Sequence, residues 1–145
     1  MKNREEVMNH LFVELFNHLL YIEEINIQKS GIDLTMTEVH TIEAVANVDI
    51  PSMSNIAKSL MITIGTATTA IKKLEKKGYV ERIREQSDAR VVLVKLTPKA
   101  YDVLAIHDEF HRNMIEHILD NLGTQEEEIL LEALTKIKTF FNKEK

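Results

Sequence analysis

Two short helices followed by a strand are encoded in residues 52–84, SMSNIAKSLMITIGTATTAIKKLEKKGYVERIR. Ser52 or Ser54 can cap the first helix, and Thr63 can cap a second helix that runs almost to Gly78. Glycine readily adopts the left-handed conformation that ends a helix. Two helices joined by a tight turn, with basic residues on the second, predict a helix-turn-helix motif.

A β-hairpin is predicted directly after this motif. Residues 79–84, YVERIR, and residues 91–96, VVLVKL, have the composition of strands and are separated by a polar turn. Thr97 and Pro98 can then begin a long helix that runs to about Leu122. A hairpin that follows a recognition helix forms a wing, so the pattern predicts a winged helix-turn-helix.

The first segment is predicted to be a helix that is buried on more than one face. Residues 4–28 have helical periodicity, but their apolar side chains fall on two sides. Leu11, Leu15, Ile22 and Ile25 lie on the first side, and Phe12, Phe16, Leu19 and Leu20 lie on the second. In a chain of 145 residues, the second side is expected to contact another subunit.

The predicted fold class is therefore mostly α, a winged helix-turn-helix with long N- and C-terminal dimerisation helices. Residues 1–145 are expected to form one domain, because a domain usually holds about 150 residues. Within it, we expect a winged lobe over about residues 35–99 and dimerisation helices over about residues 4–28 and 98–143.

The charge of the chain is distributed unevenly. The net charge is −5, with 18 basic and 23 acidic residues. Residues 52–99 alone hold ten basic and four acidic residues and carry +6, so the rest of the chain carries −11. An acidic protein with one basic segment is expected to bind a polyanion at that segment.

The composition disfavours an enzyme and a membrane protein. The chain has no cysteine, no glycine-rich phosphate loop and no Ser/His/Asp arrangement, so we expect no catalytic site and no required cofactor. The longest uncharged stretch, residues 59–71, is shorter than the ~18 apolar residues of a membrane span. The N-terminal sequence MKNREEVMNHL is charged and does not resemble a signal peptide. We therefore expect a cytoplasmic protein that does not contact a membrane.

The recognition helix offers short side chains for contacts with double-stranded DNA. Thr66, Thr68 and Thr69 lie within four residues, although threonine is a mediocre helix former. Their methyl groups can touch thymine methyls, and their hydroxyls can reach bases or phosphates, which favours A·T-rich half-sites. Further along, Lys72 and Lys73 can contact phosphates. The DNA-contacting residues predicted for this helix are Thr63, Gly65, Thr66, Thr68, Thr69, Lys72 and Lys73.

The predicted wing supplies the remaining candidate contacts with DNA. Arg90 at its tip can enter a narrow minor groove, where the negative potential is deepest. Asp88, two residues earlier, is expected to hold the Arg90 guanidinium in place. Arg82 and Arg84 share one face of the first wing strand and are expected to contact phosphates.

Three stretches of this region resemble the MarR family of bacterial transcription regulators. They are LEKKGYVER at 74–82, DAR at 88–90 and LTPK at 96–99. The chain departs from the family pattern at Ala89, where arginine is common, and at Ala100, where glycine is common. The change at Ala89 removes one possible phosphate contact.

Four other stretches are similar to the FabT-like branch of this family, the repressors of bacterial fatty-acid biosynthesis genes. They are IEEIN at 22–26, HTI at 40–42, LMITIGTATT at 60–69 and FHRNM at 110–114. The resemblance implies a homodimer that binds a palindromic operator. It also implies that acyl chains presented on acyl carrier protein strengthen DNA binding.

Histidines suggest an alternative ligand. His107 and His111 have the i, i+4 spacing of metal ligands on one helix. With His40 and the pair Glu23/Glu24, they resemble the zinc site of zinc-responsive members of the family. The candidate metal ligands are Glu24, His40, His107 and His111, and the competing interpretation is a cluster of hydrogen-bonded polar residues.

A cavity for an acyl chain is expected between the dimer interface and the DNA-binding lobe. Apolar placement suggests Phe12, Phe16, Leu19, Ile42 and Phe110 as its lining. Two other hypotheses remain open at this point. One is a zinc-responsive repressor, and the other is a helical dimerisation module that does not bind DNA.

Overall fold

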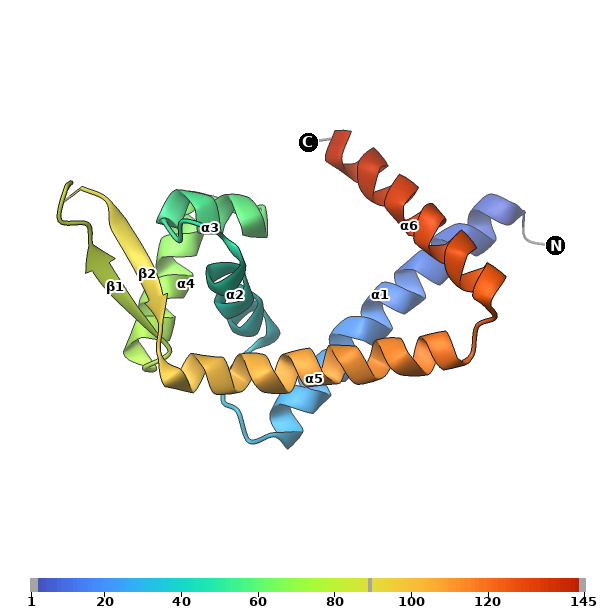
Figure 1. Cartoon of the computed structure of the whole chain (residues 1–145), viewed down its shortest axis with the longest axis horizontal. Helices are drawn as coiled ribbons and strands as arrows, with labels where there is room; N and C mark the ends of the chain where they lie inside the picture. Colours follow the sequence, from blue (N-terminus) through green and yellow to red (C-terminus); the bar gives the residue numbers. More distant parts are fainter. Residues whose placement is uncertain (1–2, 89, 144–145) are drawn as a thin grey trace. The chain divides into compact units, whose positions relative to one another are not determined.

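The computed structural model describes residues 3–88 and 90–143, so Ala89 lies outside the described residues. The chain divides into two compact units, Met1–Asp108 and Glu109–Lys145, called unit 1 and unit 2 below. Helices dominate both units, and the two strands pair in a single sheet, as the sequence predicted (Figure 1). The elements of unit 1 are α1 (Arg4–Lys29), α2 (Met36–Asn47), α3 (Met53–Leu60), α4 (Ile64–Lys76), β1 (Val80–Arg84), β2 (Val92–Leu96) and the first part of α5 (Pro98–Asp120). Unit 2 holds the second part of α5 and α6 (Thr124–Lys143).

Side-chain caps define where the helices of the winged lobe begin. Thr35 and Glu38 form a reciprocal capping box at the start of α2. Ser52 accepts from the N–H of Asn55 at the start of α3, and Thr63 accepts from the N–H of Thr66 at the start of α4. Each such cap stabilises its helix by about 0.5–2 kcal/mol. The structure thus selects Ser52 over Ser54 for the first cap of the helix-turn-helix.

Two residues with positive φ set the turns that follow α3 and α4. Met61 has φ 58° between the two helices, a conformation that the sequence pattern did not indicate. Gly78 has φ 87° after α4, as expected for a glycine that ends a helix. The turn at Met61 directs α4 away from α3, and Gly78 directs the chain into β1.

The wing is an antiparallel hairpin of β1 and β2 in which Val80 faces Leu96 and Arg84 faces Val92. The N–H of Val94 also donates to the carbonyl of Pro51 at 2.8 Å, and Ser52 bridges to Leu93. The segment before α3 therefore extends the sheet by one short bridge. These contacts fasten the wing to the helix-turn-helix.

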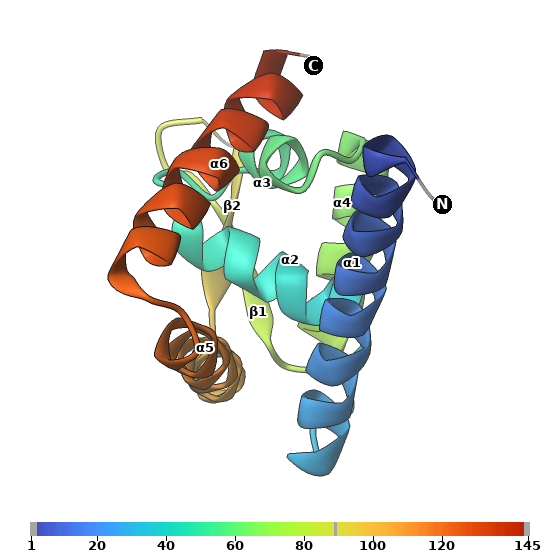
Figure 2. The same cartoon turned by 90° about the vertical axis from the view of Figure 1, so that its right-hand side faces the viewer.

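The core of unit 1 lies around α2, which packs against α1, α3, α4 and β2 (Figure 2). It is formed by Ile27, Val39, Ile42, Ala44, Val45, Ile56, Ile71, Leu74, Tyr79, Val80, Val94, Leu96, Ala100, Val103 and Leu104. Every element of unit 1 contributes to this set. The first part of α5 is joined to the lobe by the Thr97 hydroxyl, which donates to the carbonyl of Gly78 at 2.7 Å.

Large apolar side chains remain exposed on the long helices. In α1 only Glu23 and Ile27 are buried. The exposed apolar residues of α1 are Val7, Met8, Leu11, Phe12, Val13, Leu15, Phe16, Leu20, Tyr21 and Ile22. In unit 2 the corresponding residues are Ile115, Ile118, Leu119, Ile129, Leu130, Leu131, Leu134, Phe140 and Phe141. Among residues 3–88 and 90–143, no helix is both long and apolar enough to cross a lipid bilayer.

Glu38 connects the beginning of α2 with the end of α4. Its carboxylate accepts from the N–H of Thr35 at 3.1 Å, and Lys77 Nζ donates to both of its oxygens at 3.0 and 3.1 Å. Burial by itself would raise the pKa of Glu38. The hydrogen bonds from the Thr35 backbone and from Lys77 outweigh burial, so the pKa of Glu38 lies below its ordinary value.

We expect Glu38→Gln to destabilise the fold at neutral pH and to remove a pH-dependent part of its stability. Because the pKa of Glu38 is lowered by folding, its contribution is complete above the ordinary value of 4.5 and disappears as the pH falls through the lowered value. Urea midpoints measured from pH 7 to pH 3 should fall more steeply for wild type than for the variant. Glu24→Gln, at an exposed position, is the control. Parallel pH profiles for wild type and Glu38→Gln would contradict this assignment.

Candidate nucleic-acid interface

Helix α4 has one face in the core and one in solvent. Ala67, Ile71 and Leu74 are fully buried. Residues four apart lie above one another on a helix. The outer surface of α4 therefore has two adjacent rows, Ile64–Thr68–Lys72 and Gly65–Thr69–Lys73. Thr68 is half-buried and the other members of these rows are exposed, so the predicted contact residues of α4 share one accessible face.

Gly65 lies at the centre of this face, and neither steric crowding nor backbone conformation requires glycine there. A Cβ atom placed on Gly65 would meet no heavy atom within 4 Å. The backbone is helical, so no positive φ requires glycine either. Glycine in a helix costs about 0.5–1 kcal/mol relative to alanine. A close approach of another molecule to the helix backbone is the physical reason that remains.

The wing tip is organised as the sequence predicted. Asp88 accepts from the backbone N–H of Arg90 at 3.0 Å and from its Nε at 3.2 Å. These bonds, that of the backbone first, hold the pKa of Asp88 below its ordinary value. The Arg90 side chain is nevertheless 92% exposed. An arginine that is oriented by a carboxylate and still accessible is suited to enter a groove of DNA.

Arg82 has a partner that the sequence analysis missed. Its guanidinium binds Glu75 on α4, with Nη2 3.0 Å and Nε 3.1 Å from the carboxylate, and its backbone N–H donates to the same group at 3.3 Å. The hydrogen bond from the Arg82 side chain is the main reason that the pKa of Glu75 is lowered. Arg82 therefore ties β1 to α4. Arg84, two residues later on the same face of the strand, is exposed.

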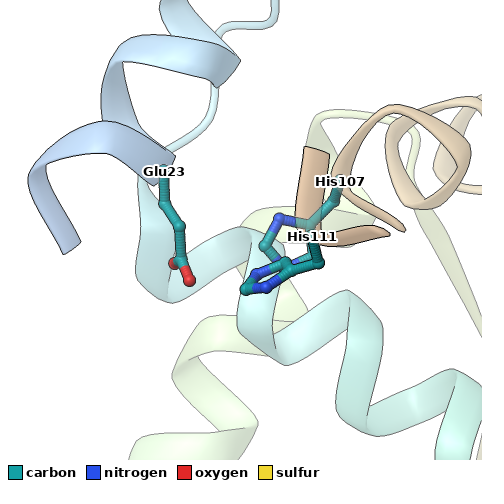
Figure 3. Close-up of side chains that lie close together, drawn as sticks. All are labelled: Glu23, His107 and His111. Carbon is teal, nitrogen blue, oxygen red and sulfur yellow. The ribbon is translucent and has the colours of Figure 1, made fainter. Parts of the chain in front are cut away.

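Two histidines of unit 1, His40 and His107, lie in a cluster with two carboxylates. His40 Nε2 is 3.0 Å from Glu23, His107 Nε2 is 3.1 Å from Glu43, and the two rings are 5.8 Å apart. His107 and Glu23 are almost completely buried, with exposed fractions of 1% and 3%. Their ligand atoms lie within 4.8 Å of one another. His111 follows one turn after His107 on α5 (Figure 3).

The structure places Glu23, and not the candidate ligand Glu24, against His40. Glu24 is exposed, whereas Glu23 bonds to His40. Consecutive residues of a helix point in directions about a quarter turn apart, so only one of the pair can face the histidines. The buried residue Ile27, four positions after Glu23, marks the inward side. The sequence did contain a signal for this choice, because an apolar residue four positions after a glutamate indicates that the glutamate lies on the inward side of the helix.

The residues suggested for a ligand cavity lie in different surroundings. Ile42 is fully buried in the core of unit 1, while Phe12 and Phe16 are exposed on α1. Leu19 is half-buried on α1, and Phe110 is half-buried in unit 2. Phe12 lines an open depression with Met8 and the polar residues Arg4, Glu5 and Asn9. The lining of an acyl-chain cavity stays a prediction.

Comparison with known proteins assigns the family. A family model described as MarR matches residues 34–92. The structure of Streptococcus pneumoniae FabT in complex with DNA superposes with a TM-score of 0.93 and 35% identity, over 97% of this chain and 99% of that chain. The chain belongs to the MarR family.

Other relatives of this MarR-family chain agree with the assignment. The regulator SarZ of Staphylococcus haemolyticus is 37% identical over 71 residues, which are 49% of this chain and 48% of the relative. The match thus spans about half of that relative's length. MepR of Staphylococcus aureus in complex with DNA shares the fold, with a TM-score of 0.77 and 21% identity over 91% of this chain and 96% of that chain. Members of the MarR family are DNA-binding transcription regulators, so this chain is such a regulator and not an enzyme.

We expect Gly65→Ala to separate stability from DNA binding. Alanine should raise the free energy of unfolding by about 0.5 kcal/mol, because it is the better helix former and has space for its methyl group. It should weaken DNA binding if the backbone of α4 approaches DNA closely. Thermal melting and fluorescence anisotropy with labelled DNA measure the two effects. A more stable variant with unchanged affinity would show that Gly65 does not face DNA.

Arg90→Ala is the matched comparison, because it removes a groove contact at the wing and leaves α4 intact. DNA affinity should fall by about 1–3 kcal/mol, the cost of a lost specific contact, without a change in melting temperature. Arg112→Ala, at an exposed arginine outside the basic segment, should leave both quantities unchanged. Equal affinities of wild type and Arg90→Ala would remove Arg90 from the interface.

Proposed function

We propose that the protein is a homodimeric repressor that binds a palindromic, A·T-rich DNA operator. The observation that carries the proposal is the outer face of α4, in which two rows of small side chains end in Lys72 and Lys73. Arg90, oriented by Asp88, supplies a second contact on the wing. The similarity to FabT bound to DNA supports the same conclusion.

The dimer is proposed from the apolar surfaces of the long helices. An exposed apolar surface as continuous as that of α1 between Val7 and Ile22 marks an interaction site in a protein of this size. The exposed apolar side chains of unit 2, which lie between Ile115 and Phe141, support a dimerisation role for that unit. Two-fold symmetric dimers match palindromic operators, because each subunit reads one half-site.

We expect the chain to sediment as a dimer at micromolar concentration. A charge placed in the apolar surface, Leu15→Glu, should shift it to a monomer, because burying an unpaired carboxylate in an interface is unfavourable. Glu14→Lys, a charge change next to it on the exposed helix, is the control. A wild-type monomer at these concentrations would refute the proposed interface.

We further propose that the protein regulates fatty-acid biosynthesis genes, with acyl chains on acyl carrier protein as the effector. The support is the resemblance of four stretches to the FabT-like branch, together with 35% identity to FabT over nearly the whole chain. An effector of this kind acts only if it binds one arrangement of the dimer better than another.

A zinc-responsive repressor is the second candidate, because the histidine cluster favours it. Glu23 and His107 lie close together and are buried, and His111 follows on the same helix face. Zinc binds imidazole nitrogens and carboxylates in such sets. Against this candidate, Nε2 of His40 already bonds to Glu23, and Nε2 of His107 already bonds to Glu43.

Operator affinity measured with each effector separates the two candidates. We expect acyl carrier protein that carries a long acyl chain to change operator affinity by tenfold or more, which corresponds to a coupling free energy of about 1.4 kcal/mol. We expect zinc to have no effect. The salt concentration must be fixed, because phosphate contacts make affinity depend on salt. Unacylated carrier protein is the control. A tenfold effect of zinc that the double change His107→Ala and His111→Ala abolishes, with none from the acyl carrier, would favour the second candidate. Binding to no DNA even at low salt would leave only a dimerisation module.

A further inference from the structure

The first two turns of α4 present a surface without charged or amide side chains. From Ile64 to Thr69 the outer residues are isoleucine, glycine and threonine, and lysine begins only at Lys72. Ile64 is 55% exposed, although the first turn of a helix favours acidic residues. The core of unit 1 does not include Ile64. The Ile64 side chain is therefore accessible to another molecule.

The threonine hydroxyls of this surface already donate within the helix. Thr68 Oγ1 donates to the carbonyl of Ile64 at 2.8 Å, and Thr69 Oγ1 donates to the carbonyl of Gly65 at 3.1 Å. Thr63 and Thr66 share a hydrogen bond between their hydroxyls at 2.8 Å. A hydroxyl has one proton. Thr68 and Thr69 can therefore only accept a further hydrogen bond.

The same bonds determine what these two side chains offer to DNA. A hydroxyl that bonds to the carbonyl four residues earlier holds χ1 in one rotamer, so the position of the methyl group is set as well. Thr68 and Thr69 then present a methyl group and an acceptor oxygen, but no donor. Beside them, Ile64 adds apolar surface on the row of Thr68.

A surface of methyl groups and acceptor oxygens is suited to thymine in the major groove. Guanine shows only acceptors there, which Thr68 and Thr69 cannot satisfy, whereas thymine carries the one methyl group among the bases. We propose that Ile64 and the methyl groups of Thr68 and Thr69 recognise the C5-methyl groups of thymine. This inference rests on the proposed function, because it requires α4 to enter the major groove.

Neighbouring residues provide the close approach and the affinity that recognition of methyl groups needs. Contact between methyl groups requires carbon atoms about 4 Å apart, which short side chains reach only if the helix backbone comes close to the bases. Gly65 leaves space for that approach. Lys72 and Lys73, one turn further along the two rows, can bind phosphates and provide affinity without reading sequence.

The test replaces thymine by deoxyuridine, which lacks the C5-methyl group and keeps every hydrogen-bonding group. A duplex that the full-length chain selects from a random-sequence pool is prepared with thymine or with deoxyuridine in both half-sites. We expect about fourfold lower affinity for each contacted methyl group that is removed, the scale of one buried methyl. The minor-groove edge is the same in both duplexes, so the Arg90 contact is not altered. Deoxyuridine outside the half-sites is the control and should have no effect.

Paired substitutions assign the effect to the methyl groups of the protein. Thr68→Val and Thr69→Val keep a methyl group and remove the hydroxyl, so they should retain affinity and the preference for thymine over deoxyuridine. Thr68→Ser and Thr69→Ser keep the hydroxyl and remove the methyl group, so they should lose that preference. Ile64→Ala should reduce it as well. Thermal melting confirms that each variant is folded.

Each outcome supports or overturns the inference. Equal binding to the thymine and deoxyuridine duplexes overturns methyl recognition and leaves the repressor proposal intact. Selected half-sites without thymine overturn methyl recognition and the A·T-rich operator, but not DNA binding itself. Serine variants that keep the thymine preference while valine variants lose it would show that the hydroxyls read the sequence. Binding to no duplex at any salt concentration overturns both proposals.

Discussion

The orientation of α4 about its own axis depends on the burial of Ala67, Ile71 and Leu74. Side chains of a helix are separated by fixed angles, at about 3.6 residues per turn. Burying this row therefore directs Gly65 and Thr69 to the opposite side. The apolar core thus decides which polar and small residues DNA can reach, and a rotation of α4 would expose apolar side chains and hide the threonines. The buried face of α4 thus serves stability, and the opposite face is the one that we propose contacts DNA.

Two acidic residues within the basic segment bind two of its arginines and hold them in place. Glu75 holds Arg82 and joins the wing to α4, and Asp88 holds Arg90 at the wing tip. In an exposed setting each pair contributes little to stability. The effect of each pair is on the orientation of the arginine. A guanidinium that is already oriented loses less conformational entropy when it binds another group. The net charge of +6 over residues 52–99 therefore does not describe the site fully, because it does not show that two of the arginines are held in place by carboxylates.

Two features of unit 1 involve α1, namely a cluster of titratable side chains and an exposed apolar surface. The cluster of Glu23, His40, Glu43 and His107 joins α1, α2 and α5 by hydrogen bonds between titratable groups. The apolar surface of α1 is exposed, because only two residues of Arg4–Lys29 are buried. The bond between Glu23 and His40 joins α1 to α2 within unit 1.

The sequence by itself determined the elements and their order, because these depend on local physical chemistry. The cap at Thr63, the helix stop at Gly78, the change of period after it and the pairing of Asp88 with Arg90 each depend on residues that are close together in the sequence. Contacts between distant segments were decided only by the tertiary structure. The pairing of Arg82 with Glu75, and the choice of Glu23 over Glu24, depend on the relative rotation of packed elements. Local patterns leave that rotation open, since it follows from how complete side chains fill the core.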